Sequence, residues 1–155
     1  MQISARKTAL AQHLEVEGGV LVTPARAAIL ELGILDLVEK TKSGQLLPIT
    51  VLEAYQAKAL EVDEKLNAVC DFILEAAEWA KNLESVPENE RGPLYGVPVS
   101  VKECFFVKGY DATIGFAKLI NMPAQQDGSI VKTLKDLHAV PFCLTNIPQT
   151  MCSYR

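Results

Sequence analysis

Lys102 is the residue with the clearest capacity for chemistry. It ends the apolar run Val97–Lys102 and is followed by Cys104, Phe105 and Phe106. Desolvation beside apolar side chains lowers the pKa of a lysine and lets its neutral amine act as a base. The other interpretation is a lysine whose aliphatic stem covers apolar surface while its ammonium stays in water. Composition alone favours the second interpretation.

Other side chains give little sign of chemistry. Ser100 and Ser153 lie near apolar segments, but neither is in a Gly-x-Ser-x-Gly elbow. His13 and His138 are far apart, and the four cysteines form no Cys-x-x-Cys pair, so we predict neither a metal site nor a redox motif. The cysteines are expected to lie reduced in the core. No glycine-rich phosphate loop is present, so no cofactor is predicted.

The bulk composition describes one ordinary domain. The chain has 155 residues, of which 49% are hydrophobic, and its formal net charge is −4. The basic residues are scattered, so no polyanion-binding face and no nucleic-acid partner are expected. No run approaches the roughly 18 apolar residues that indicate a transmembrane segment. Residues 1–22 carry no clear pattern and are expected to be flexible.

The secondary-structure elements that would position Lys102 begin with a predicted helical layer over residues 24–84. Thr23–Pro24 is a typical helix start, with threonine as the N-cap and proline in the first turn. Apolar residues then recur at helical spacing, and Gly33 is expected to divide the run into two short helices. Pro48 marks a second start, and Asn67 closes that helix.

After this helix the pattern becomes mixed, which predicts an α/β fold. Pro98 indicates a strand that lies at an edge or has just begun. The expected elements, in chain order, are a strand over 68–73, a helix over 74–83, an exposed loop over 85–96, a strand over 97–102, an irregular stretch over 103–126, a helix capped within 127–129 and running to 137, and a strand over 140–144.

Five blocks of the sequence carry a family resemblance. Residues 92–105, Gly-Pro-Leu-Tyr-Gly-Val-Pro-Val-Ser-Val-Lys-Glu-Cys-Phe, resemble the first block of the amidase-signature family, Gly-x-Leu-x-Gly-(Ile/Val)-Pro-x-x-x-Lys. The Lys-Glu-Cys-Phe ending and residues 108–113 are similar to the fatty acid amide hydrolase branch, which includes the vitamin D3 hydroxylase-associated proteins. Residues 127–131, 139–142 and 145–151 match the following blocks in order.

The resemblance implies a fold, a reaction and site residues. The fold would be an N-terminal helical layer plus the first strands of an amidase-signature mixed sheet, an incomplete domain with its motif region at 92–154. The reaction would be hydrolysis of fatty acid primary amides and N-acylethanolamines by a Ser-Ser-Lys arrangement. Lys102 matches the position of the lysine base, while Met151, Ser153 and Tyr154 match positions that line the substrate site.

Two departures from the family pattern bear on activity. The Gly-Gly-Ser-Ser-Gly-Gly block of the family is not among these residues, so we expect a chain truncated before both catalytic serines and inactive alone. The alternative is an inactive isoform or pseudoenzyme that binds lipid amides or a full-length subunit, and a small helical scaffold has the least support. His138 stands where the family has a glycine that ends a helix in a left-handed conformation, which histidine tolerates less well.

The resemblance also suggests a setting for the protein. It implies a cytoplasmic location at the cytosolic face of internal membranes, and it leaves open a homodimer or a pairing with a full-length subunit. The predicted strands 97–101 and 140–144 would each leave an open apolar edge, which favours aggregation. We therefore expect the isolated chain to be poorly stable.

Overall fold

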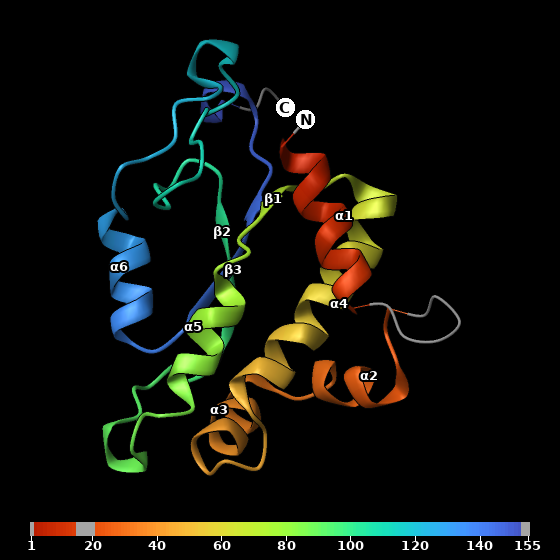
Figure 1. The fold of residues 1–155 in the computed structure, drawn as a ribbon, viewed down its shortest axis with the longest axis vertical. Coiled ribbons are helices and arrows are strands. Elements are labelled where there is room, and N and C mark those ends of the chain that lie inside the picture. Colours follow the sequence, from red (N-terminus) through yellow and green to blue (C-terminus); the bar gives the residue numbers. More distant parts are fainter. Residues whose placement is uncertain (1, 15–20, 153–155) are drawn as a thin grey trace.

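The computed structural model describes residues 2–14 and 21–152 as helices packed around a small mixed sheet (Figure 1). Its helices are α1 (Gln2–Leu14), α2 (Pro24–Leu30), α3 (Ile34–Lys42), α4 (Pro48–Leu66), α5 (Ala76–Leu83) and α6 (Ser129–Asp136). Its strands are β1 (Val69–Phe72), β2 (Pro98–Lys102) and β3 (Val140–Thr145), and its short 3-10 helices are η1 (Glu88–Glu90), η2 (Ala117–Leu119) and η3 (Gln149–Met151). The mixed α/β class predicted from the sequence is confirmed.

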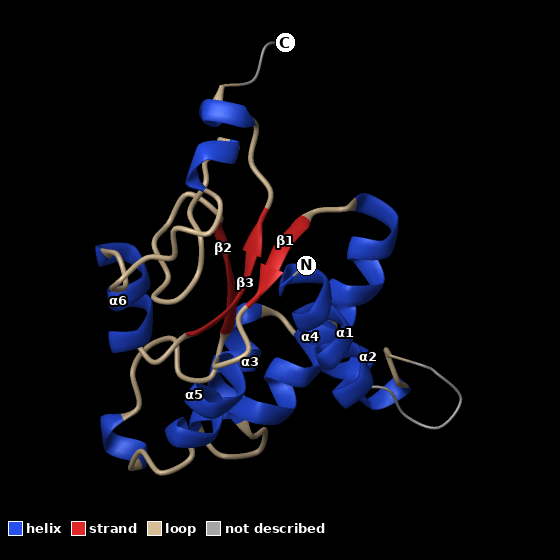
Figure 2. Cartoon of the chain, turned by 45° about the horizontal axis from the view of Figure 1, so that its top comes forward, coloured by secondary structure: helices blue, strands red, loops and turns tan. Residues whose placement is uncertain are grey.

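The sheet has the strand order β1-β3-β2. β2 and β3 run parallel and are joined through α6, while β1 pairs with β3 in the antiparallel sense. In both views α6 lies to one side of the strands, and α1 and α4 lie to the other (Figures 1 and 2). Helices on both sides explain why β3 is an almost continuous apolar run rather than an alternating one.

The position of β3 corrects one prediction. We expected residues 140–144 to form an open edge, but β3 has a neighbouring strand on both sides. The expectation for Pro98 is confirmed, because Pro98 opens β2 and β2 lies at an edge of the described sheet. Only one of the two segments that we expected to be open is therefore an edge strand.

The helical layer follows its predicted start and stop residues. The Thr23 hydroxyl accepts a hydrogen bond of 3.3 Å from the Arg26 backbone N–H, and Pro24 is the first residue of α2. Gly33 separates α2 from α3, Pro48 opens α4, and Asn67 ends α4 in a left-handed conformation with φ of 48°. Helix α4 contributes buried apolar side chains to the core beneath the sheet.

One local feature differs from the sequence pattern. The pattern predicts no element within residues 1–22, yet α1 forms there and buries Leu10 and Leu14 in the main core. The cap of α6 lies within the predicted residues 127–129, because its N-cap is Gly128, which has no side chain to make a capping hydrogen bond. The Asp127 carboxylate instead accepts hydrogen bonds from the Lys108 backbone N–H at 2.8 Å and from Lys135 Nζ at 2.6 Å.

Candidate active site

The carboxyl ends of the two parallel strands bring Lys102 and the segment containing Met151 to one end of the sheet. Lys102 is the last residue of β2 and pairs in register with Thr145, the last residue of β3. Parallel strands point the same way, so the segment that follows β3 leaves the sheet beside Lys102. That segment leads through Pro148 to η3, which contains Met151 (Figure 1). In open α/β sheets this end is where ligands bind.

The structure places two of the four predicted site residues. Lys102 is exposed, and it makes no side-chain hydrogen bond or ion pair within residues 2–14 and 21–152. Met151 is 58% exposed, whereas Ser153 and Tyr154 lie outside the described residues. The described part of the chain thus does not provide the apolar cover that a lysine base requires.

Glu103 is a buried acid at this end of the sheet that the sequence reasoning did not single out. Its backbone N–H extends the β2–β3 ladder by donating to the Thr145 carbonyl at 3.0 Å. Its carboxylate accepts from the backbone N–H groups of Thr113 and Ile114, the second at 3.0 Å. An acidic residue directly after the candidate base was the available signal, but a sequence does not show that this acid is buried.

The opposite end of β2 and β3 is closed by the first motif block. A Cβ atom on Gly92 would lie 2.6 Å from the Leu137 carbonyl oxygen, so only glycine fits this approach. The buried Tyr95 donates its hydroxyl proton to the Leu83 carbonyl at 2.8 Å, and its own carbonyl accepts from Thr41 Oγ1 at 2.7 Å. The Gly92 approach explains why the block begins with a glycine, and the Tyr95 contacts show that the block is packed against the helical layer.

His138 occupies the left-handed position that we predicted for it, with φ of 64°. The His138 N–H donates to the Lys135 carbonyl and the Ala139 N–H donates to the Leu134 carbonyl, both at 2.9 Å, which is a Schellman ending for α6. The imidazole Nδ1 accepts from the Gly92 N–H at 2.9 Å. This bond fastens the histidine to the first motif block and offsets part of the strain.

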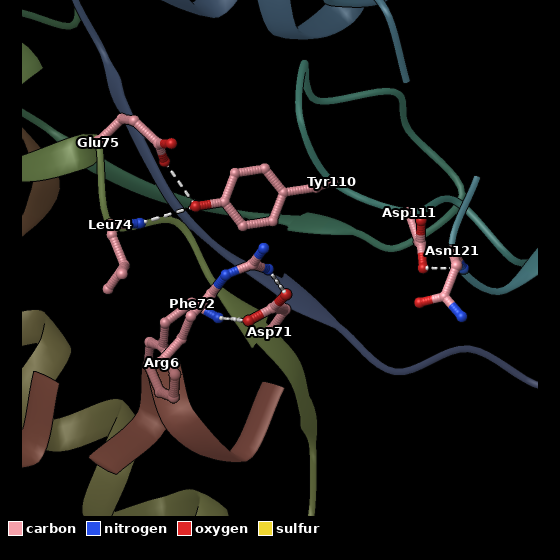
Figure 3. A network of polar contacts seen from close by, with 8 residues as sticks. All are labelled: Arg6, Asp71, Phe72, Leu74, Glu75, Tyr110, Asp111 and Asn121. Atoms are coloured by element: carbon pink, nitrogen blue, oxygen red, sulfur yellow. Dashed lines mark hydrogen bonds and ion pairs between the residues drawn. The ribbon is translucent and has the colours of Figure 1, made fainter. Parts of the chain in front are cut away.

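A polar network joins α1, β1 and the long loop that follows β2 (Figure 3). Arg6 forms an ion pair with Asp71, and its guanidinium lies 4.6 Å from the centre of the Tyr110 ring. The Tyr110 hydroxyl donates to Glu75 at 2.5 Å and accepts from the Leu74 N–H at 3.0 Å. The network fixes the start of the loop against the helical side of the molecule.

Burial dominates the titration of this network. Burial raises the pKa of Asp71 although the Arg6 guanidinium and the Phe72 N–H act in the opposite direction. Burial, together with the hydrogen bond to Glu75, raises the pKa of the Tyr110 hydroxyl, which therefore remains a proton donor at neutral pH. We therefore interpret the network as structural: its hydrogen bonds hold the loop in place, and its one hydroxyl, that of Tyr110, stays protonated.

A cavity of about 1000 Å³ opens beside this network. Arg6, Asp71, Glu103 and Asp111 contribute charged groups to its wall, and Cys70 and Asn146 are among its other lining residues. Neither Lys102 nor Met151 lines this cavity, so the cavity does not contain the predicted base. Glu103 is the residue that belongs to this wall and directly follows Lys102 in the chain.

The four cysteines are free, but only Cys143 is buried, and Cys152 is exposed. The expectation that all four lie in the core is therefore wrong. Burial raises the pKa of Cys70 to about 11 and that of Cys143 to about 12, so both thiols stay protonated at neutral pH. A protonated thiol is a poor nucleophile.

The described residues show neither the side-chain arrangement of a metal site nor a membrane-spanning helix. Within residues 2–14 and 21–152 no group of histidine, cysteine and acidic side chains has the arrangement of a metal site. In the same part of the chain no helix combines the length and apolar character needed to cross a bilayer.

Comparison with known proteins identifies relatives for most of the chain. The family model described as Amidase matches residues 50–155. The vitamin D3 hydroxylase-associated protein of Gallus gallus is 41% identical over 128 residues, which cover 83% of this chain and 27% of that protein. Fatty-acid amide hydrolase 1 of Sus scrofa is 44% identical over 126 residues, which cover 81% of this chain and 21% of that protein.

A solved structure described as fatty acid amide hydrolase has the same fold in this region. It superposes with a TM-score of 0.76 at 25% sequence identity, and the match covers 93% of this chain and 27% of that chain. The chain thus spans about a quarter of the length of the curated relatives it matches.

Proposed function

This chain belongs to the amidase family, and from that premise we propose that it carries the lysine base of an enzyme that hydrolyses fatty acid amides. The observation that carries the proposal is the block from Gly92 to Phe105, whose lysine, Lys102, ends a parallel strand beside the segment that contains Met151. The substrates would be fatty acid primary amides and N-acylethanolamines, cleaved to a fatty acid and an amine.

The proposed reaction uses Lys102 as the final proton acceptor of a serine relay. The neutral lysine amine takes a proton from a bridging serine, which takes one from a second serine as that oxygen attacks the amide carbonyl carbon. The C–N bond then breaks, the departing amine receives the proton, and water hydrolyses the acyl-serine ester to the fatty acid. The family's Gly-Gly-Ser-Ser-Gly-Gly block is not among these residues, and we propose that the bridging serine and the nucleophilic serine both lie outside them.

A lysine base must be neutral when it accepts the proton, and burial favours the neutral form. Because Lys102 is exposed in the described structure, we propose that its cover comes from further parts of an amidase fold, on a longer chain or on a partner subunit. Met151, Ser153 and Tyr154 would line the site that binds the substrate. The exposed thioether of Met151 at the same end of the sheet is consistent with that role.

A second candidate is a catalytically inactive isoform that binds lipid amides or pairs with a full-length subunit. Co-purification with a full-length amidase, without hydrolysis by the chain alone, is the result that this candidate predicts.

The test transplants residues 92–155 into the matching segment of the pig enzyme and measures oleamide hydrolysis. The chimera should be active, and Lys102→Ala should lower its kcat by roughly a thousandfold or more, as expected when a general base is lost from a relay. Lys118→Ala, at an exposed lysine in η2, is the matched control. Full activity of the Lys102→Ala chimera would show that Lys102 is not the base.

The isolated 155-residue chain supplies the second measurement. A serine-directed fluorophosphonate probe should leave it unlabelled, because none of its serines lies in the family's nucleophile block. Labelling at Ser100 or Ser153 would instead assign the nucleophile to this segment and contradict the proposed relay.

A further inference from the structure

Glu103 is a buried carboxylate directly beside the exposed Lys102. Glu103 is only 6% exposed as a residue, whereas Lys102, one residue earlier, is exposed. Acidic side chains are rarely buried unless their oxygens are satisfied. A carboxylate enclosed at the end of β2 therefore needs partners, and these partners show what the residue holds.

The partners of Glu103 are two successive backbone N–H groups. One carboxylate oxygen accepts from Thr113 and the other accepts from Ile114 at 3.0 Å. Successive N–H groups of this kind form a concave cradle for an anion. Hydrogen bonds to a charged acceptor are among the stronger ones in proteins, so this contact fixes the loop at residues 113–114 to the end of β2.

The loop passes this constraint on to the turn that contains Met151. The Ile114 carbonyl accepts from the Thr150 N–H at 3.0 Å, and a Cβ atom on Gly115 would lie 2.9 Å from Gln149 Cα. Ile114 and Thr150 have φ of 52° and 59°. Such left-handed backbone is unfavourable for β-branched residues, so it persists only where surrounding contacts hold it in place.

We propose that Glu103 is a positioning residue that links the strand end carrying Lys102 to the turn carrying Met151, through Thr113, Ile114 and Thr150. The inference rests on the proposed function, because it gives Glu103 the task of keeping the base and the substrate wall in register. Glu103 acts through the backbone of its neighbours and touches no reacting atom.

The test compares Glu103→Gln with wild type in the 155-residue chain. A glutamine side chain has one acceptor oxygen and an NH₂ group, so one of the two N–H donors loses its partner. Hydrogen–deuterium exchange should rise by roughly tenfold or more at residues 113–114, as expected for the loss of a charge-assisted bond. It should rise at Thr150 as well, while the β2–β3 ladder keeps its protection.

A second readout follows Lys102 itself, through the ¹³Cε resonance of that lysine assigned with a Lys102→Arg variant. This resonance should shift in Glu103→Gln while those of the other lysines stay in place. Glu103→Asp keeps two acceptor oxygens on a shorter side chain and should give an intermediate change. Glu88→Gln, at an exposed acid in η1, is the matched control and should change neither readout.

Faster exchange at residues 113–114 with no change at Thr150 or at the Lys102 resonance would overturn the proposal and leave Glu103 as a local staple of the loop. If Glu103→Gln loses protection from exchange along the whole β2–β3 ladder, the variant has unfolded locally. The same two measurements on Glu103→Asp then test the proposal. Neither readout uses catalysis, so a failed hydrolysis test overturns the proposed function while the exchange experiment still decides the link.

Discussion

The two ends of the parallel strand pair β2–β3 are built differently. The closed end, formed by Gly92–Val97 with Thr41 and His138, has buried side chains and short backbone approaches. The open end, formed by Lys102, Glu103, the loop 104–126 and η3, exposes five large apolar side chains, namely Phe106, Phe116, Ile120, Met122 and Met151.

The difference separates stability from function within one strand. Five residues of β2 lead from a packed motif at the closed end to an exposed lysine at the open end. A residue at the closed end is expected to matter for folding, and a residue at the open end is expected to matter for chemistry. The same division is seen in α/β barrels, where catalytic residues lie at the carboxyl ends of the strands.

Tyr95→Ala should give the largest change in stability, because Tyr95 fills the closed end with an aromatic ring and is only 1% exposed as a residue. Removing a buried aromatic ring costs about 3–5 kcal/mol. Urea denaturation followed by circular dichroism would measure the free energy of unfolding. A loss below about 1 kcal/mol, the mean for point substitutions, would mean that the closed end is not a packed unit.

Asp63→Asn tests the flank of the open end that α1 covers. Burial alone would raise the pKa of Asp63, but hydrogen bonds from Lys7 and from the Val69 N–H outweigh burial and hold this pKa below its ordinary value. The substitution should lower the free energy of unfolding by about 1.5–3 kcal/mol at neutral pH, the range for a hydrogen bond to a charged group.

The same variant has a pH signature. A carboxyl whose pKa is lower in the folded state contributes stability that is present above its unfolded pKa and is lost as the pH falls through the folded pKa. Asp63→Asn should therefore flatten the loss of stability below about pH 4. Glu61→Gln, which removes an exposed partner of Lys58 and Lys65, should leave stability unchanged within error. An unaltered acid limb in Asp63→Asn would show that α1 is not fastened by this ion pair.

His138→Ala should cost about 1 kcal/mol, since it removes the acceptor of the Gly92 N–H while retaining a left-handed backbone. His138→Gly loses the same acceptor but relieves the backbone strain, so its loss should be smaller. Thermal unfolding of the two variants would compare them directly. Greater instability in the glycine variant would mean that the left-handed position carries no strain.

Lys102→Ala should have the smallest effect on stability, within about 0.5 kcal/mol, because an exposed side chain without partners in the described structure contributes little to folding. The same urea denaturation would measure its free energy of unfolding, for direct comparison with that of Tyr95→Ala. A large loss of stability in Lys102→Ala would break the division between the two ends.

The sequence by itself determined the local elements and the family. Proline fixes its own φ angle and lacks a backbone N–H donor. Pro24 and Pro48 therefore start helices, and Pro98 opens an edge strand, for reasons that are local to each residue. Asn67 and His138 take the left-handed positions that end α4 and α6 for equally local reasons. The motif around Lys102 indicated the family. Its glycine at position 92 is needed for close packing at the closed end.

Only the tertiary structure decided what α1, β3 and Glu103 do. Helix α1 is held by Arg6 and Lys7, whose partners Asp71 and Asp63 lie 65 and 56 positions further along the chain. β3 is central because β1 pairs antiparallel with the edge of β3 that β2 leaves free. The hydrophobic periodicity of the sequence does not reveal this pairing. Glu103 is buried because residues 113–114 wrap back over it, whereas its neighbour Lys102 stays exposed. Each outcome depends on contacts between distant segments, and such contacts exist only once the chain has folded.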